Sequence, residues 1–252
     1  MRKPTVKEDA FGAAMWDYYR GLPGNEIVER DDGGIEADGG PRCYLHEFDK
    51  WGPHEQSAIA LARGRVLDIG CGAGRVGVHL QQKGLEVVGI DNSPLAVRVC
   101  RKRGLKRTHV MSITQIGPKL GRFDTLVMFG NNFGLFGNLQ RARRLLRRFW
   151  RLTNPGAQIL AESRDIYPRP GRPGLKEHLD YHRRNRRCGR MAGQVRIRIR
   201  YRRHCTPWFD YLLVSPAEMR EIVKGTGWKV ARLFKTDGPG YVAVLRRLES
   251  RA

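Results

Sequence analysis

Three glycines at alternate positions, set between two short apolar runs, constrain this chain more than any other feature. Within residues 65–91 the first apolar run leads into Gly70, Gly72 and Gly74, and the second ends on Asp91. The spacing predicts a strand, a glycine loop, a helix and a second strand in that order. Glycine lets the loop turn tightly and lets a ligand approach the main chain closely. The helix N-terminus offers free N–H groups, and the carboxylate of Asp91 can accept hydrogen bonds from both hydroxyls of a ribose. Together they predict a site for a nucleoside-containing cofactor.

The glycine spacing separates the candidate cofactors. Dinucleotide sites carry G-x-G-x-x-G, whereas this loop reads G-x-G-x-G with Asp68 two residues before its first glycine. A carboxylate there suits a cofactor with a positive centre and an ammonium group and would repel a pyrophosphate, which disfavours a nicotinamide oxidoreductase. Residues 68–75 resemble motif I of the class I S-adenosylmethionine-dependent methyltransferases, and residues 88–91 resemble their second motif. The resemblance extends at least from Arg65 to Gly134.

The resemblance implies an α/β, Rossmann-like class I methyltransferase fold. It would have a seven-stranded, mostly parallel sheet with helices on both faces, and an inserted antiparallel strand pair after strand five. The expected domains are an N-terminal cap segment at 1–64 and an S-adenosylmethionine-binding domain at 65–252, with a lid-like insertion at about 164–214. The implied cofactor is S-adenosylmethionine, which leaves as S-adenosylhomocysteine.

Cofactor contacts are expected in the loops that follow the predicted strands. Asn92 follows the ribose-binding acid, and Ser112 ends the third strand, where relatives often place an Asp. Tyr19 belongs to an aromatic segment that resembles the cap of such enzymes. The predicted cofactor-binding residues are Asp68, Gly70, Cys71, Gly72, Gly74, Asp91, Asn92, Ser112, Phe129, Gly130 and Tyr19.

Catalytic candidates follow the fourth strand, 123–129, because ligands of open α/β sheets lie at the carboxyl ends of the strands. Asn131 and Asn132 stand there, but the Asn/Asp-Pro-Pro-aromatic tetrapeptide of base-methylating enzymes is absent. That absence counts against methylation of base amino groups. His46 is a candidate general base or substrate contact. Methyl transfer is an in-line displacement that needs positioning more than a nucleophile triad.

Two segments outside the glycine-loop unit carry structural signals. Residues 194–203 alternate apolar and basic side chains, which is typical of a half-buried strand, and 206–214 reads as its antiparallel partner. This pair is either a lid over the substrate or a surface for a second subunit in a homodimer. Residues 25–43 are acidic and rich in glycine, which predicts a loop.

Composition leaves the partner open. Lys and Arg number 47 against 25 Asp and Glu, a net charge of +22 that indicates either a polyanionic partner such as RNA or solvated basic faces. Five cysteines without a C-x-x-C pair favour neither a disulfide framework nor zinc. His178 and His182 stand four residues apart but lack an evident third ligand, so no metal is predicted. With no secretory signal and no apolar run of about 20 residues, we expect a cytoplasmic protein without a membrane span.

The favoured hypothesis is an S-adenosylmethionine-dependent methyltransferase that transfers a methyl group to a small molecule by in-line displacement. Two alternatives remain: an RNA methyltransferase, motivated by the positive charge, and a nucleic-acid-binding protein that keeps the cofactor fold without chemistry.

Overall fold

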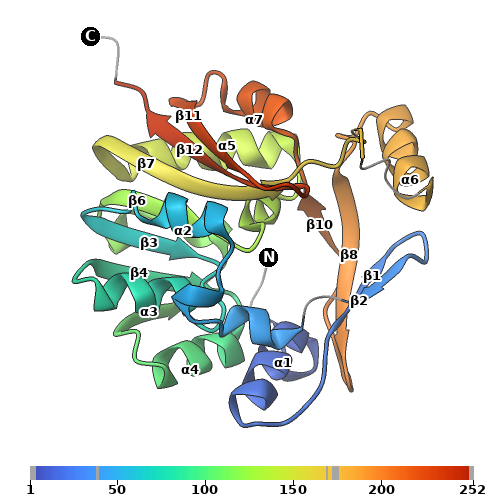
Figure 1. Ribbon diagram of the computed structural model, residues 1–252, viewed down its shortest axis with the longest axis horizontal. Helices are drawn as coiled ribbons and strands as arrows, with labels where there is room; N and C mark the ends of the chain where they lie inside the picture. Colours follow the sequence, from blue (N-terminus) through green and yellow to red (C-terminus); the bar gives the residue numbers. More distant parts are fainter. Residues whose placement is uncertain (1–3, 38–39, 169, 172–175, 250–252) are drawn as a thin grey trace.

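The computed structural model describes residues 4–37, 40–168, 170–171 and 176–249. Its larger sheet has seven strands and is drawn with the helices around it in Figure 1. Its strands run in the order β11-β12-β7-β6-β3-β4-β5, and every neighbouring pair is parallel except those that involve β12. The predicted sheet is therefore confirmed. The strands are β3 (Arg65–Ile69), β4 (Glu86–Asp91), β5 (Arg107–Val110), β6 (Phe123–Met128), β7 (Thr153–Arg164), β11 (Trp228–Lys235) and β12 (Gly240–Arg247).

Helices cover both faces of this sheet, as expected. Alternate residues of one strand serve opposite faces: Leu67 belongs to the hydrophobic cluster that includes α5 and α7, whereas its neighbour Val66 belongs to the cluster that includes α2 and α3. Both side chains are almost fully buried, which explains why the strands read as continuous apolar runs in the sequence. The helices are α2 (Pro53–Ile59), α3 (Arg75–Gln82), α4 (Pro94–Lys102), α5 (Leu139–Arg151) and α7 (Pro216–Val223).

A second, antiparallel sheet stands beside the first in the order β10-β8-β1-β2, with β9 also on β8. The expected pairing of the two inserted strands is confirmed, since Tyr211 lies opposite Val195. The strands are β1 (Ile27–Arg30), β2 (Ile35–Ala37), β8 (Gln194–Tyr201), β9 (His204–Cys205) and β10 (Phe209–Leu212).

The prediction of a loop over residues 25–43 was wrong in part, because this segment supplies β1 and β2. Its acidity has a structural reason: Glu29 on β1 lies opposite Arg198 on β8, with two oxygen–nitrogen contacts of 2.8 Å. The acid pairs across the sheet with the basic face of the inserted strand. The sequence hides this partnership because the two residues are far apart along the chain.

The N-terminal segment joins the two sheets. Helix α1 (Ala10–Tyr19) packs against α4 and β8. Asp9 fixes this arrangement, because its carboxylate caps α1 at the Gly12 N–H and also accepts from the Leu95 N–H at the start of α4, each at 3.1 Å. Short 3₁₀ helices lie at Val6–Glu8, Pro41–Tyr44, Phe48–Lys50, Ile113–Gln115, Pro118–Leu120 and Asn132–Phe136.

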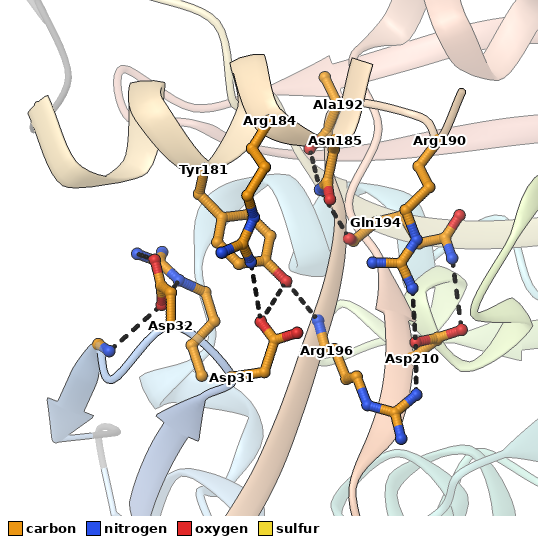
Figure 2. A network of polar contacts seen from close by, with 12 residues as sticks. Asp31, Asp32, Tyr181, Arg184, Asn185, Arg190, Ala192, Gln194, Arg196 and Asp210 are labelled. Atoms are coloured by element: carbon orange, nitrogen blue, oxygen red, sulfur yellow. Dashed lines mark hydrogen bonds and ion pairs between the residues drawn. The ribbon is translucent and has the colours of Figure 1, made fainter. Parts of the chain in front are cut away.

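Helix α6 (Lys176–Arg187) lies at the outer side of the second sheet (Figure 1). Figure 2 shows how it is attached: the Tyr181 hydroxyl donates to Asp31 at 2.7 Å and accepts from the Arg196 N–H at 3.1 Å. The Asn185 amide donates to the carbonyls of Ala192 and Gln194. Polar contacts therefore hold α6 to both the N-terminal hairpin and the insertion. In the described part of the chain, no helix has the length and apolar character to cross a membrane.

Candidate active site

A cavity of about 1200 Å³ lies where the two sheets meet. Its first half is bounded by the carboxyl ends of β3, β4, β5 and β6, and its second by α1, α6 and the antiparallel sheet. The first half is the expected place for a cofactor. The second is walled by apolar and aromatic side chains, including Ile197, Trp208 and Phe209.

The glycine loop forms one wall of the first half. Gly70, Gly72 and Gly74 all have left-handed backbone, with φ of 73°, 52° and 85°, which L side chains rarely adopt. The loop is anchored from behind, because the N–H groups of Gly70 and Cys71 donate to the Ile90 carbonyl at 2.9 and 3.0 Å. The main chain of the loop therefore faces the cavity without side chains in the way.

Asp91 lies at the end of β4 and accepts two main-chain hydrogen bonds. One oxygen accepts from the Gly72 N–H at 3.0 Å and the other from the Ser93 N–H at 2.9 Å. Burial nevertheless raises the pKa of this carboxyl to about 6, against the effect of those hydrogen bonds. Hydroxyl donors from the cavity would stabilise the ionised carboxylate.

Asp68 is the most perturbed acid of the site. Its side chain is almost fully buried, and its Oδ2 atom has no hydrogen-bond partner among the described residues. Burial raises its pKa to about 7, with Arg75 opposing the shift and Asp91 adding to it. A buried acid beside a half-buried one, both with raised pKa values, is a site for a cationic group, because such a group would restore the solvation that burial removes.

The loop after β6 closes the site from the opposite side. Asn132 donates both amide hydrogens across the cavity floor, to the carbonyls of Ile69 at 3.0 Å and Gly70 at 2.9 Å. Asn131 has left-handed backbone, and its carbonyl accepts from the Tyr211 hydroxyl at 2.6 Å. Asn132 thus ties this loop to the glycine loop, and Asn131 ties it to the second sheet.

The structure brings twelve of the fourteen predicted site residues to the cavity wall. Two lie elsewhere. Gly74 turns inward, where an added Cβ would lie 2.6 Å from the Cys100 sulfur, so it serves helix packing. Tyr19 stacks on Trp16 and is partly exposed at the end of α1. The twelve are His46, Asp68, Gly70, Cys71, Gly72, Asp91, Asn92, Ser112, Phe129, Gly130, Asn131 and Asn132.

The sequence reading missed a polar group at the end of β7. Glu162 lines the cavity, and its Oε2 accepts from the Gly130 N–H at 2.6 Å, while His54 Nε2 lies 3.9 Å from Oε1. The signal in the sequence was an acid directly after the mostly apolar residues 157–161, which contain one glutamine, Gln158. Tertiary structure gives that acid its meaning, because it places Glu162 beside the β6 loop.

Comparison with known proteins agrees with this geometry. Residues 66–156 match the family model of a methyltransferase domain, and a S-adenosylmethionine-dependent methyltransferase from Bacteroides fragilis, crystallised with S-adenosyl-L-homocysteine, superposes with a TM-score of 0.81. This chain has the class I methyltransferase fold. The B. fragilis structure is 24% identical in sequence, and the match covers 98% of each chain. A second methyltransferase structure, from Methanosarcina mazei, gives a TM-score of 0.58 at 18% identity over 79% of this chain and 98% of that one.

Curated relatives that this chain matches in sequence carry the names of both N- and O-methyltransferases. A glycine/sarcosine N-methyltransferase from Halorhodospira halochloris is 28% identical over 107 residues, which are 40% of each protein. A ubiquinone biosynthesis O-methyltransferase from Xanthomonas oryzae pv. oryzae is 28% identical over 140 residues, 53% of this chain and 56% of that protein. The chain therefore spans about half the length or less of these relatives.

Proposed function

We propose that this protein is an S-adenosylmethionine-dependent methyltransferase that transfers a methyl group to a small molecule by in-line displacement. The observation that carries the proposal is the pair of acids on the cavity wall, the buried Asp68 and the half-buried Asp91, whose carboxyl pKa values are both raised. The cofactor supplies an electrophilic methyl group on a sulfonium and also carries an ammonium and a ribose. Asp68 would hold the ammonium, Asp91 the ribose hydroxyls, and the main chain of Gly70–Gly72 the amino acid part.

The remaining residues of the first half complete this assignment. Asn92 and Ser112 lie at the ends of β4 and β5, where they would border the adenine. Phe129 and Gly130 follow β6 directly and line the cavity, where they would face the place of methyl transfer. The chain's contribution to the rate is to align the acceptor with the methyl group and to keep water out.

The second half of the cavity suits a small acceptor. Its walls come from α1, α6 and the antiparallel sheet. The acceptor would therefore be enclosed by the described residues of the cap segment 1–64 and of the lid-like insertion at about 164–214. Apolar walls with a few polar groups are typical of small-molecule sites. The proposal includes the cytoplasmic location expected from the sequence.

The positive charge does not require a nucleic acid. On α5, where arginines are densest, Arg143, Arg147 and Arg148 each donate to a main-chain carbonyl of a neighbouring segment, at 3.2, 3.3 and 2.8 Å. These contacts use the arginines to join elements of this chain. They support a small-molecule acceptor over the RNA alternative.

Calorimetric titration with S-adenosylhomocysteine tests the proposal, with NAD as the control ligand. We expect micromolar binding of S-adenosylhomocysteine, no binding of NAD, and at least a tenfold loss of affinity in Asp91→Asn, because the ribose would lose charge-assisted hydrogen bonds. Asp49→Asn, an exposed acid outside the cavity, is the matched control and should bind like the wild type. A wild-type protein that ignores S-adenosylhomocysteine would refute the proposal.

A further inference from the structure

The end of β7 presents two charged side chains to the second half of the cavity. Glu162 and Arg164 both line it. Ser163, between them, faces the other way: it is fully buried and its hydroxyl accepts from the Val214 N–H at 3.1 Å. Two residues along a strand on the same face start about 7 Å apart. The cavity therefore holds a carboxylate and a guanidinium in a defined row.

Glu162 is the residue of this row that lies nearer to the first half of the cavity, where the cofactor is expected. Its Oε2 accepts a hydrogen bond from the Gly130 N–H at 2.6 Å. Gly130 lies in the loop that follows β6. The side chain is mostly buried, and no arginine or lysine of the described residues forms an ion pair with it. A carboxylate held this way keeps acceptor capacity for a proton donor in the cavity.

Arg164 is the member farther out, and it is unpaired. No hydrogen bond or ion pair joins it to another described residue, and its side chain is exposed at the cavity. The other two arginines of the cavity wall are neutralised: Arg75 by Glu55, and Arg30 by Asp32 at 2.7 Å. An anionic group that enters the cavity thus has one guanidinium open to it.

We propose that the methyl acceptor is a small apolar acid that carries a hydroxyl group, with Arg164 binding the acid and Glu162 acting as the general base. This inference rests on the proposed methyltransferase function. The hydroxyl oxygen would form a bond to the methyl carbon as the carbon–sulfur bond breaks, and that electron pair would stay on sulfur. The hydroxyl proton would pass to Glu162. The aromatic walls at Trp208 and Phe209 suit a flat, apolar body between the two polar ends.

Hydroxylated aromatic acids are the matching probes, because a hydroxyl and a carboxylate across a benzene ring have a similar separation. The protein loaded with S-adenosylhomocysteine would be titrated with 3- and 4-hydroxybenzoate, 4-hydroxyphenylacetate and the amide of each. We expect at least one acid to bind about tenfold or more tightly than its amide, as a charge-assisted contact predicts. Arg164→Gln should abolish this preference, and Arg232→Gln, an arginine outside the cavity, should keep it. Equal binding of acids and amides, or a preference that survives Arg164→Gln, would overturn the acceptor class.

Glu162→Gln distinguishes a general base from a purely structural residue. The amide oxygen can still accept the hydrogen bond from the Gly130 N–H, but the amide cannot take up the proton. With the preferred phenolic acid we expect kcat to fall about 10²- to 10³-fold at unchanged affinity for S-adenosylhomocysteine. With the 3-nitro derivative of 4-hydroxybenzoate, whose phenol is largely ionised at neutral pH, the loss should shrink to a few-fold because no base is needed. The same loss on both acceptors, or no loss on either, would contradict the role of Glu162, as would acid binding without methyl transfer.

The two proposals fail in different ways. Absence of S-adenosylhomocysteine binding would remove the methyltransferase function itself. Tight binding of S-adenosylhomocysteine combined with indifference to the acid group would leave that function intact and reject only the assignment of Glu162 and Arg164.

Discussion

Replacing Asp68 with Asn should stabilise the cofactor-free protein while it destroys cofactor binding. The carboxylate is 2% exposed, and its Oδ2 has no hydrogen-bond partner in the described structure. Its pKa is raised from an ordinary value of 3.8 to about 7, chiefly by burial. An amide of the same shape removes the buried charge. The site is therefore expected to trade stability for function, as binding sites commonly do.

The magnitude follows from linkage. The folded state holds the Asp68 proton more tightly than the unfolded state, so the folded state binds more protons between pH 4 and pH 7. Stability therefore falls as pH rises through that window. A shift of about three pKa units at about 1.4 kcal/mol each corresponds to about 4 kcal/mol above pH 7, and to about 2 kcal/mol at pH 5. Asp68→Asn does not lose this stability, because its amide does not ionise.

Urea unfolding at several values between pH 5 and pH 8.5, without cofactor, measures the effect. The advantage of Asp68→Asn over the wild type should grow from about 2 to about 4 kcal/mol across this range. Asp49→Asn, whose carboxylate is exposed, should show no such trend. With saturating S-adenosylhomocysteine, only the wild type should gain stability. An advantage that does not change with pH, or a variant less stable than the wild type at pH 8, would refute the buried-charge reasoning.

Three further perturbations follow from single contacts. Tyr181→Phe removes the 2.7 Å hydrogen bond to Asp31 shown in Figure 2, so we expect a loss of about 1–2 kcal/mol in urea unfolding and faster proteolysis around α6; unchanged cleavage would contradict the anchoring role. Trp228→Phe leaves a void and removes the hydrogen bond that the indole donates to the Leu146 carbonyl at 2.9 Å, and should cost about 2–4 kcal/mol in the same assay. Burial, with His178 adding to it, lowers the pKa of His182 to about 4, so the contribution of His182 to stability should fall as pH drops from about 6.5 to about 4, and thermal scans of His182→Gln against the wild type should show the variant gaining relative stability over that window.

The first half of the cavity was predictable from the sequence because the motif residues that form it lie close together along the chain. The glycines, Asp68 and Asp91 lie within one short segment, and strand–loop–helix–strand geometry brings such residues together in any chain that carries them. Gly74 and Tyr19 were the exceptions. Gly74 belongs to the predicted glycine loop, but packing turned it toward Cys100; Tyr19 ends α1 and lies beyond the cavity.

The second half of the cavity, where we propose that the acceptor binds, is formed by contacts between distant parts of the chain. The hairpin β1–β2 forms because its acids meet the arginines of β8, as Glu29 meets Arg198 some 170 residues later. Nothing in the local sequence of either segment encodes that pairing. The sequence by itself determined the strand–loop–helix–strand unit and the chemistry of the glycine loop, since both follow from short-range periodicity and spacing. The seven-stranded sheet followed from the resemblance that these motifs carry. Only the tertiary structure decided which charges line the second half of the cavity, because a cavity wall is assembled from elements whose neighbours are set by packing and not by sequence order.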